Sequence, residues 1–148
     1  MGLCNSSLND DDIKRELNNS IKFVPNIRKA LVVKVYDGDT ITIVTKLKLF
    51  GPKYKFSVRL KGIDAPEMKT KDIEEKKVAI KSRDWLSERI LGRKIILKNV
   101  SYEKYGRLLA DIYYDGKISL NQRLVNNRLA VKYDGGTKQK INWKKYSY

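Results

Sequence analysis

The chain has 148 residues, and 32 Lys and Arg against 17 Asp and Glu give it a formal net charge of +15. Its length and its 41% apolar content fit one domain with one packed core, and the excess positive charge favours a polyanionic partner, either nucleic acid or an acidic membrane surface. The lack of His and the single cysteine, Cys4, exclude His-based catalysis, an intramolecular disulfide and a Cys/His zinc site.

Residues 1–25 are expected to form a flexible leader, because the first 20 are rich in Asn, Asp and Ser. A short helix over residues 13–17, capped by one of the aspartates at 10–12, is consistent with this segment. The start MGLCNS matches the N-myristoylation pattern on Gly2, and Cys4 is placed for palmitoylation; chance is the alternative. Two acyl chains hold a protein stably on a bilayer, so an acylated chain would lie on the cytoplasmic face of a membrane, and otherwise in the cytoplasm. No signal peptide is expected.

Residues 26–148 are expected to form the single folded domain, which starts with β-strand patterns. Residues 30–36 and 40–45 are β-rich and flank Asp37-Gly38, which predicts a hairpin. Residues 54–60 alternate between apolar and polar, which predicts a strand with Arg59 facing away from the core. Two more strands are predicted, at 94–100 and 107–114.

Two helices complete the predicted elements. The longer one, over residues 72–91, has Asp72 and Glu75 at the spacing of a capping box and Gly92 at its end. The shorter one covers 119–127 and is followed by a basic segment. Five strands with a helix between the third and fourth follow the order of an OB-fold. We therefore predict an α+β fold, a five-stranded OB-fold β-barrel with two or more flanking helices.

Acidic and arginine side chains gather at the ends of these elements. Asp39 and Asp64, if brought together, would repel unless a cation lay between them, and oxygen ligands suit Ca²⁺. A nearby Glu67 would orient or deprotonate a water, while Arg59 and Arg107 would clamp a phosphodiester. Each residue alone also fits an ordinary turn, strand end or solvated charge, so the inference depends on their occurring together.

Three segments carry a resemblance to a known family: VYDGDTITI, VRLKGIDAPEM and YEKYGRLLADIYYDGK. They resemble, in spacing and order, the signature segments of the staphylococcal (micrococcal, thermonuclease-type) nuclease family, and the match runs over about residues 28–132. The resemblance implies an OB-fold nuclease that uses Ca²⁺ to cleave DNA and RNA with little sugar preference and leaves 3′-phosphates.

The resemblance also implies a role for each matching residue. Asp39, Asp64 and the backbone carbonyl of Ala65 match the calcium ligands, and Asp37 matches an acid that supports the metal through water. Glu67 matches the carboxylate that acts on the attacking water. The matches that contact phosphate are Arg59, Arg107, Lys104 and Tyr105.

Two departures from the family pattern bear on this assignment. Ala65 stands where the bacterial enzymes have Thr, which keeps a carbonyl but removes a hydroxyl. The family's long final helix is missing, so residues 133–148 are expected to close that side differently. Three aromatic residues in this segment could stack on a base, but packing against the protein is the preferred explanation: Tyr133, Trp143 and Tyr146.

Two other functions remain open on the sequence. One is a non-catalytic OB-fold module that binds nucleic acid or a protein, and the other is an adaptor whose basic face meets an anionic membrane. Retention of the metal acids, the water acid and both arginines favours the enzyme. A monomer with no disulfide partner is expected.

Overall fold

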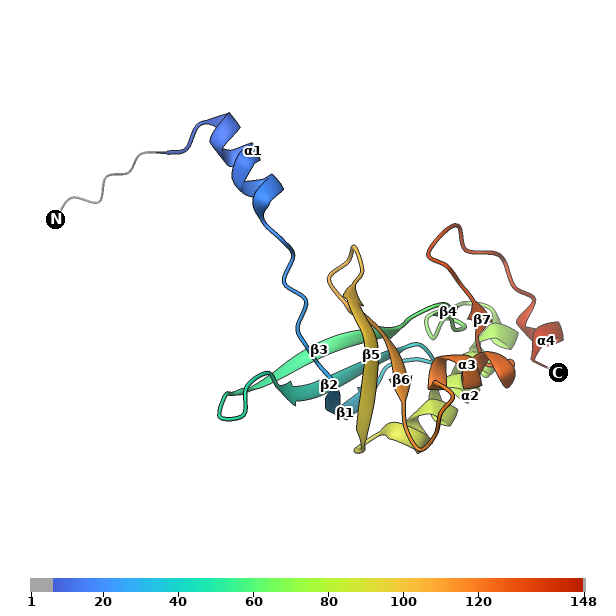
Figure 1. Cartoon of the computed structure of the whole chain (residues 1–148). Coiled ribbons are helices and arrows are strands. Elements are labelled where there is room, and N and C mark those ends of the chain that lie inside the picture. The colour runs from blue at the N-terminus through green and yellow to red at the C-terminus, as the bar shows by residue number, and fades with distance from the viewer. Residues whose placement is uncertain (1–6, 148) are drawn as a thin grey trace.

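The computed structural model describes residues 7–147, and its centre is a closed barrel of five strands in the order β1-β2-β3-β6-β5 (Figure 1). All neighbouring strands are antiparallel except β3 and β6, which run parallel. The barrel strands are β1 (Lys29–Val35), β2 (Thr40–Lys46), β3 (Lys53–Leu60), β5 (Lys94–Tyr102) and β6 (Leu108–Tyr113). The α+β OB-fold prediction is confirmed, and each strand lies where its sequence pattern predicted it.

The long helix α2 (Ile73–Ile90) packs close to the turn between β1 and β2. A Cβ atom on Gly38 would lie 1.9 Å from the Oγ of Ser82 on this helix and 2.9 Å from the Cβ of Ala65. Only glycine leaves room for this approach. The turn that carries Asp37 and Asp39 is therefore seated between the helix and residue 65.

The start of α2 forms only half of the predicted capping box. Asp72 accepts hydrogen bonds from the backbone N–H groups of Glu74 and Glu75, at 2.8 and 3.1 Å. The carboxylate of Glu75 does not bond back to Asp72; it accepts from the N–H of Glu67 at 3.1 Å and the hydroxyl of Thr70 at 2.6 Å. Glu75 thus holds the loop that precedes the helix, which a local spacing rule does not predict.

Two short strands and two short helices lie outside the barrel: β4 (Ile63–Asp64), β7 (Val131–Lys132), α3 (Leu120–Asn126) and α4 (Trp143–Tyr146). β4 and β7 pair antiparallel, a contact that two-residue patterns are too short to predict. Trp143 is buried and the Tyr146 hydroxyl donates to the Ala130 carbonyl at 3.1 Å, which confirms packing for these two aromatics. Figure 1 shows α2, α3 and α4 gathered at one end of the barrel.

The predicted alternation of β3 holds near the helices and fails at the other end. Val58 and Leu60 are fully buried, but Tyr54 is 44% exposed. The β2–β3 hairpin extends past the core, so its outer apolar side chains are covered only in part: Leu47 and Phe56 still pack against the core, whereas Tyr54 lies beyond it. In Figure 1 this hairpin projects from the side of the barrel opposite the helices.

The N-terminal helix α1 (Asp10–Asn19) stands away from the barrel and buries no residue (Figure 1). Its cap is Asn9, which accepts from the N–H of Asp12 at 2.9 Å, so the expectation of an aspartate cap was wrong. The acylation expected at Gly2 and Cys4 falls outside the described residues and stays a prediction. Within residues 7–147, no helix has the length and apolar character needed to cross a bilayer.

Candidate active site

Asp39, immediately before β2, is the most enclosed acid of the site. Its side chain accepts hydrogen bonds from the hydroxyl of Thr40 at 3.0 Å and from the N–H of Ala65 at 2.7 Å. Its own N–H donates to the Asp37 carboxylate at 3.1 Å. The residue is only 3% exposed. These bonds fix both the carboxylate and the turn before it.

Arg59 joins Asp39 to Asp64. Its Nη1 lies 2.6 Å from Asp39 Oδ1, and its Nη2 lies 2.8 Å from Asp64 Oδ1 and 3.2 Å from the carbonyl of Ile63. The β2–β3 register places Arg59 opposite Thr40, next to Asp39. The strand alternation correctly puts Arg59 on the face opposite Val58, but the guanidinium is paired and largely buried, so the solvated-charge alternative fails.

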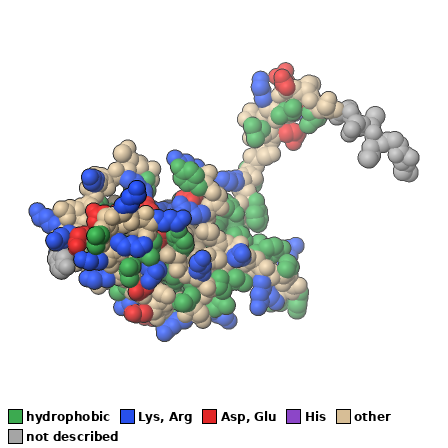
Figure 2. Space-filling view, turned by 180° about the vertical axis from the view of Figure 1, so that it is seen from behind, with side chains coloured by type: hydrophobic (Ala, Val, Ile, Leu, Met, Phe, Trp, Pro, Cys, Tyr) green, Lys and Arg blue, Asp and Glu red, His purple; other side chains and the backbone are tan. Residues whose placement is uncertain are grey.

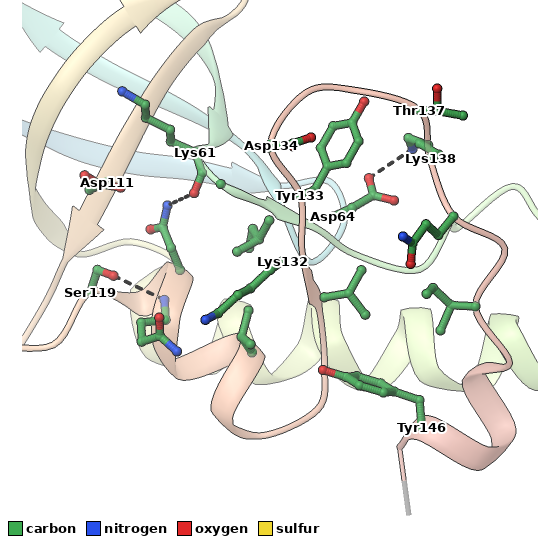
Figure 3. A pocket seen from close by; sticks show the side chains of 18 residues that line it. Lys61, Asp64, Asp111, Ser119, Lys132, Tyr133, Asp134, Thr137, Lys138 and Tyr146 are labelled. Atoms are coloured by element: carbon green, nitrogen blue, oxygen red, sulfur yellow. Dashed lines mark hydrogen bonds and ion pairs between the residues drawn. The ribbon is translucent and has the colours of Figure 1, made fainter.

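Lys138 brings a second cation to the same acids. Its Nζ lies 2.9 Å from Asp64 Oδ1 and 3.0 Å from Glu67 Oε1. Figure 3 shows Lys138 reaching from the segment after β7 toward Asp64. Lys138 belongs to the basic segment that follows the second predicted helix, and the sequence assigned it no role. Nothing in its local sequence distinguishes it from Lys140, since the contact depends on how the segment folds back.

Arg107, just before β6, also lines the cavity of the site. Its guanidinium pairs with the Glu103 carboxylate across the turn between β5 and β6, and its Nη1 lies 3.5 Å from the Thr40 hydroxyl. The Arg107 side chain is more open to solvent than that of Arg59. Nothing in the local sequence assigned Glu103 a role, and its pairing with Arg107 is seen only in the structure.

These side chains border one cavity of about 560 Å³. Its lining holds seven of the residues singled out from the sequence: Asp37, Asp39, Arg59, Ala65, Glu67, Tyr105 and Arg107. Asp64 lines an adjoining cavity of about 840 Å³, which Figure 3 shows, and Tyr133 and Lys138 line both cavities. Lys104 is the exception: it lines neither cavity, and its Nζ lies 5.0 Å from the centre of the Tyr105 ring.

Burial and the neighbouring Arg59 have opposite effects on the pKa of Asp39. Burial, together with the negative charge of Asp37, raises the pKa of Asp39 to about 7, against the opposing effect of Arg59. Burial lowers the pKa of Lys138, but its hydrogen bonds to Asp64 and Glu67 outweigh burial and raise it. The cavity therefore contains an acid, Asp39, that binds a proton readily, and a lysine, Lys138, that keeps its proton and its positive charge.

The donor atoms suit a hard divalent cation with open coordination positions. Within residues 7–147, no cluster of three or more His, Cys, Asp or Glu side chains has the geometry of a complete metal site. Two carboxylates, Asp39 and Asp64, and the Ala65 carbonyl are hard oxygen donors, and Ca²⁺ takes six to eight oxygens, so water and substrate would supply the others. Both carboxylates already pair with cations of the chain itself, Asp39 with Arg59 and Asp64 with Arg59 and Lys138, so a bound ion would have to share these oxygens with them.

This chain is similar to a nuclease family and to proteins named as endonucleases. Residues 57–147 match the family described as Staphylococcal nuclease homologue. The chain is 35% identical over 102 residues to an uncharacterized endonuclease of Haemophilus influenzae, covering 69% of this chain and 51% of the relative. It is 33% identical over 82 residues to a probable endonuclease LCL3 of Nakaseomyces delphensis, covering 53% and 32%. It is 29% identical over 103 residues to an uncharacterized endonuclease of Escherichia coli O157:H7, covering 70% and 60%.

The chain thus spans between about a third and three fifths of the length of these relatives. The family match covers more than half of this chain and includes the second half of β3 with Arg59, the loop with Asp64 and Glu67, and the β5–β6 hairpin. The resemblance carried by the three sequence segments is confirmed: the chain belongs to the staphylococcal nuclease homologue family.

Proposed function

We propose that this chain is a Ca²⁺-dependent nuclease that hydrolyses phosphodiester bonds of DNA and RNA and leaves 3′-phosphates. One observation carries the proposal: acids and arginines from four separate segments converge on one pair of adjoining cavities. The names of the relatives as endonucleases support it. The net charge of +15 supports it too, because Lys and Arg side chains attract the phosphate backbone.

Asp39, Asp64 and the Ala65 carbonyl would hold the ion. When bound, Ca²⁺ would polarise the scissile phosphate as a Lewis acid. Asp37 fixes the turn by accepting a hydrogen bond from the N–H of Asp39, and Arg59 holds the two carboxylates in place by pairing with both. This buried frame orders the acids before substrate arrives, so little rearrangement is needed.

Glu67 is the acid best placed to act on water. Its side chain is 60% exposed, in contrast to Asp39 and Asp64, and its backbone is held by Glu75. Its contact with Lys138 is the one ion pair found for it within residues 7–147. An exposed carboxylate at the cavity wall can hold an attacking water and accept its proton.

Arg107 is the arginine best placed to bind the reacting phosphate. Its partner Glu103 lies on the same hairpin at the cavity edge, so a phosphate entering the cavity can replace that carboxylate. A guanidinium offers two parallel N–H groups and stabilises charge that develops on phosphate oxygens. Tyr105, 75% exposed beside Arg107, lines the same cavity and would contact the substrate there.

The test is cleavage of single-stranded DNA and RNA oligonucleotides by the purified chain, with Ca²⁺ or with EGTA, beside Glu67→Gln. We expect cleavage only with Ca²⁺, products that a 3′-phosphatase alters, and a loss of rate of about 10²-fold or more in the variant. Lys140→Gln is the matched control, since Lys140 is exposed and lines neither cavity. Oligonucleotide binding without cleavage in any divalent ion would mean that the chain is a binding module.

A further inference from the structure

The end of the β2–β3 hairpin exposes two large apolar side chains next to each other. Leu49 is 79% exposed and Phe50 is 97% exposed. They lie in the connection formed by residues 47–52, at the far point of the projecting hairpin (Figure 1). Exposing adjacent apolar side chains on a projection is unfavourable in water, so this point is suited to a contact that covers them.

Lysines occupy the hairpin end and the neighbouring strand ends. We use the name basic tip for Leu49 and Phe50 together with the lysines of the hairpin end and of the neighbouring strand ends: Lys29, Lys46, Lys48, Lys53, Lys55 and Lys94. Four of the lysines, at positions 29, 46, 53 and 94, line a cavity of about 410 Å³ beside the hairpin, whose lining includes no acid.

The basic tip has no compensating negative charge along its own segment. No Asp or Glu occurs in the sequence between Asp39 and Asp64. Among the ion pairs found within residues 7–147, none includes a lysine of the basic tip. In Figure 2 the hairpin end, at the lower right, shows hydrophobic and basic side chains, while the acidic ones seen on this face lie elsewhere.

The basic tip lies at the end of the β2–β3 ladder opposite the candidate active site. Thr40 pairs with Arg59 at the site, and Lys46 pairs with Lys53 at the tip. At the rise of a β-strand, these two pairs are about 20 Å apart. A partner bound at the tip would leave both site cavities open to nucleic acid.

We propose that the basic tip docks the protein on an anionic phospholipid bilayer. Leu49 and Phe50 would enter the boundary between headgroups and acyl chains, and the lysines around them would contact lipid phosphates and carboxylates. A bilayer fits better than nucleic acid because it buries both apolar side chains, whereas base stacking would use Phe50 and leave Leu49 in water. This surface is separate from the proposed reaction and from the acylation expected at Gly2 and Cys4.

A reporter variant tests insertion directly. Phe50→Trp in the full, unacylated chain is mixed with phosphatidylcholine vesicles that contain or lack about 30% phosphatidylserine. We expect a blue shift of tryptophan emission, and quenching by brominated lipid, only with the anionic vesicles. Ile73→Trp is the matched control, because Ile73 is 73% exposed but lies on α2. No shift for Phe50→Trp, or an equal shift for both variants, would overturn the proposal.

Vesicle sedimentation of variants separates lipid from nucleic acid. Leu49→Ser with Phe50→Ser should lower the partition coefficient at least tenfold, and so should Lys48→Gln with Lys53→Gln, while Ile73→Ser should change it less than twofold. Unchanged thermal unfolding shows that each variant folds. If the tip variants keep their vesicle binding, or lose affinity for a single-stranded oligonucleotide instead, the bilayer is not the partner and the proposal is wrong.

Discussion

The ammonium group of Lys138 lies between two acids of the proposed reaction, 2.9 Å from Asp64 Oδ1 and 3.0 Å from Glu67 Oε1. A cation of the chain itself therefore occupies the side of the site that faces the cavities. A divalent ion on Asp64, or a proton taken up by Glu67, would each weaken this contact. Lys138 should accordingly affect metal binding as well as the charge that substrate meets.

Lys138→Met should raise the apparent affinity for Ca²⁺ about fivefold. The substitution keeps an unbranched side chain of similar length and removes the charge that competes for Asp64. Two partly exposed ion pairs contribute about 1 kcal/mol in total, which corresponds to about that factor. Calorimetry or terbium luminescence measures the affinity without relying on cleavage. Lys140→Met is the control, and equal affinities in wild type and Lys138→Met would rule out competition.

Arg107→Lys should lower the rate of cleavage about 10²-fold with little change in thermal stability. Lys replaces the positive charge but offers no pair of parallel N–H groups to a phosphate. The Arg107 side chain is 34% exposed and lies at the cavity edge, so the fold depends less on it than on Arg59. Steady-state kinetics on an oligonucleotide, together with a thermal unfolding curve, checks both parts. A near-normal rate would remove Arg107 from the proposed reaction.

Arg59→Lys should differ from Arg107→Lys because it should lower stability as well as activity. Arg59 joins two acids in the interior, and an ammonium cannot reach both with the same geometry. This variant should lose both activity and about 2 kcal/mol or more of unfolding free energy in urea. Equal losses of unfolding free energy for Arg59→Lys and Arg107→Lys would show that the buried ion pairs of Arg59 contribute no more to stability than the more exposed pair of Arg107.

The affinity for Ca²⁺ should fall as pH drops below about 7. Burial raises the pKa of Asp39 to about 7, so below that pH the ion must displace a proton from this ligand. A single such proton makes binding at pH 6 about tenfold weaker than at pH 8. Terbium or calcium titrations between pH 5.5 and 8.5 measure this, and an affinity independent of pH would mean that Asp39 is already ionised.

Without metal, the stability of the fold should change with pH in the opposite direction to the affinity for Ca²⁺. Asp39 has a pKa raised from 3.8 to about 7 in the folded chain, so its protonation stabilises the fold. This contribution is complete below pH 4 and is lost as pH rises toward 7. In EGTA, the unfolding free energy of wild type should fall relative to Asp39→Asn across this range. Parallel pH profiles for the two proteins would contradict the assignment.

Gly38→Ala should destabilise the chain by about 1 to 3 kcal/mol, because its Cβ would lie 1.9 Å from the Oγ of Ser82. Adding Ser82→Gly removes that hydroxyl and should lessen the effect of the Gly38 change, although glycine itself costs helix α2 about 1 kcal/mol. Urea unfolding of the two single variants and the double variant gives the coupling between the positions. Additive effects would mean that the contact in the structure is not the cause.

Local sequence patterns determined most of the secondary structure. Alternation predicted β3, and Asp72 with Gly92 marked the two ends of α2, because these signals need only residues close in the chain. The three family segments also indicated Asp39, Asp64, Arg59, Glu67 and Arg107 as one site, and the structure brings them to adjoining cavities. The roles of these residues in the reaction stay predictions.

Tertiary structure alone decided the contacts between distant segments. No local pattern indicated that Lys138 would reach Glu67, that β4 would pair with β7, or that Glu75 would hold the loop before its own helix. It also did not show that Tyr54 would lack a core to pack against, since alternation looks the same in both halves of β3. Burial and ion pairing depend on which segments meet in space, and only the closed barrel and the segment folded against it determine that.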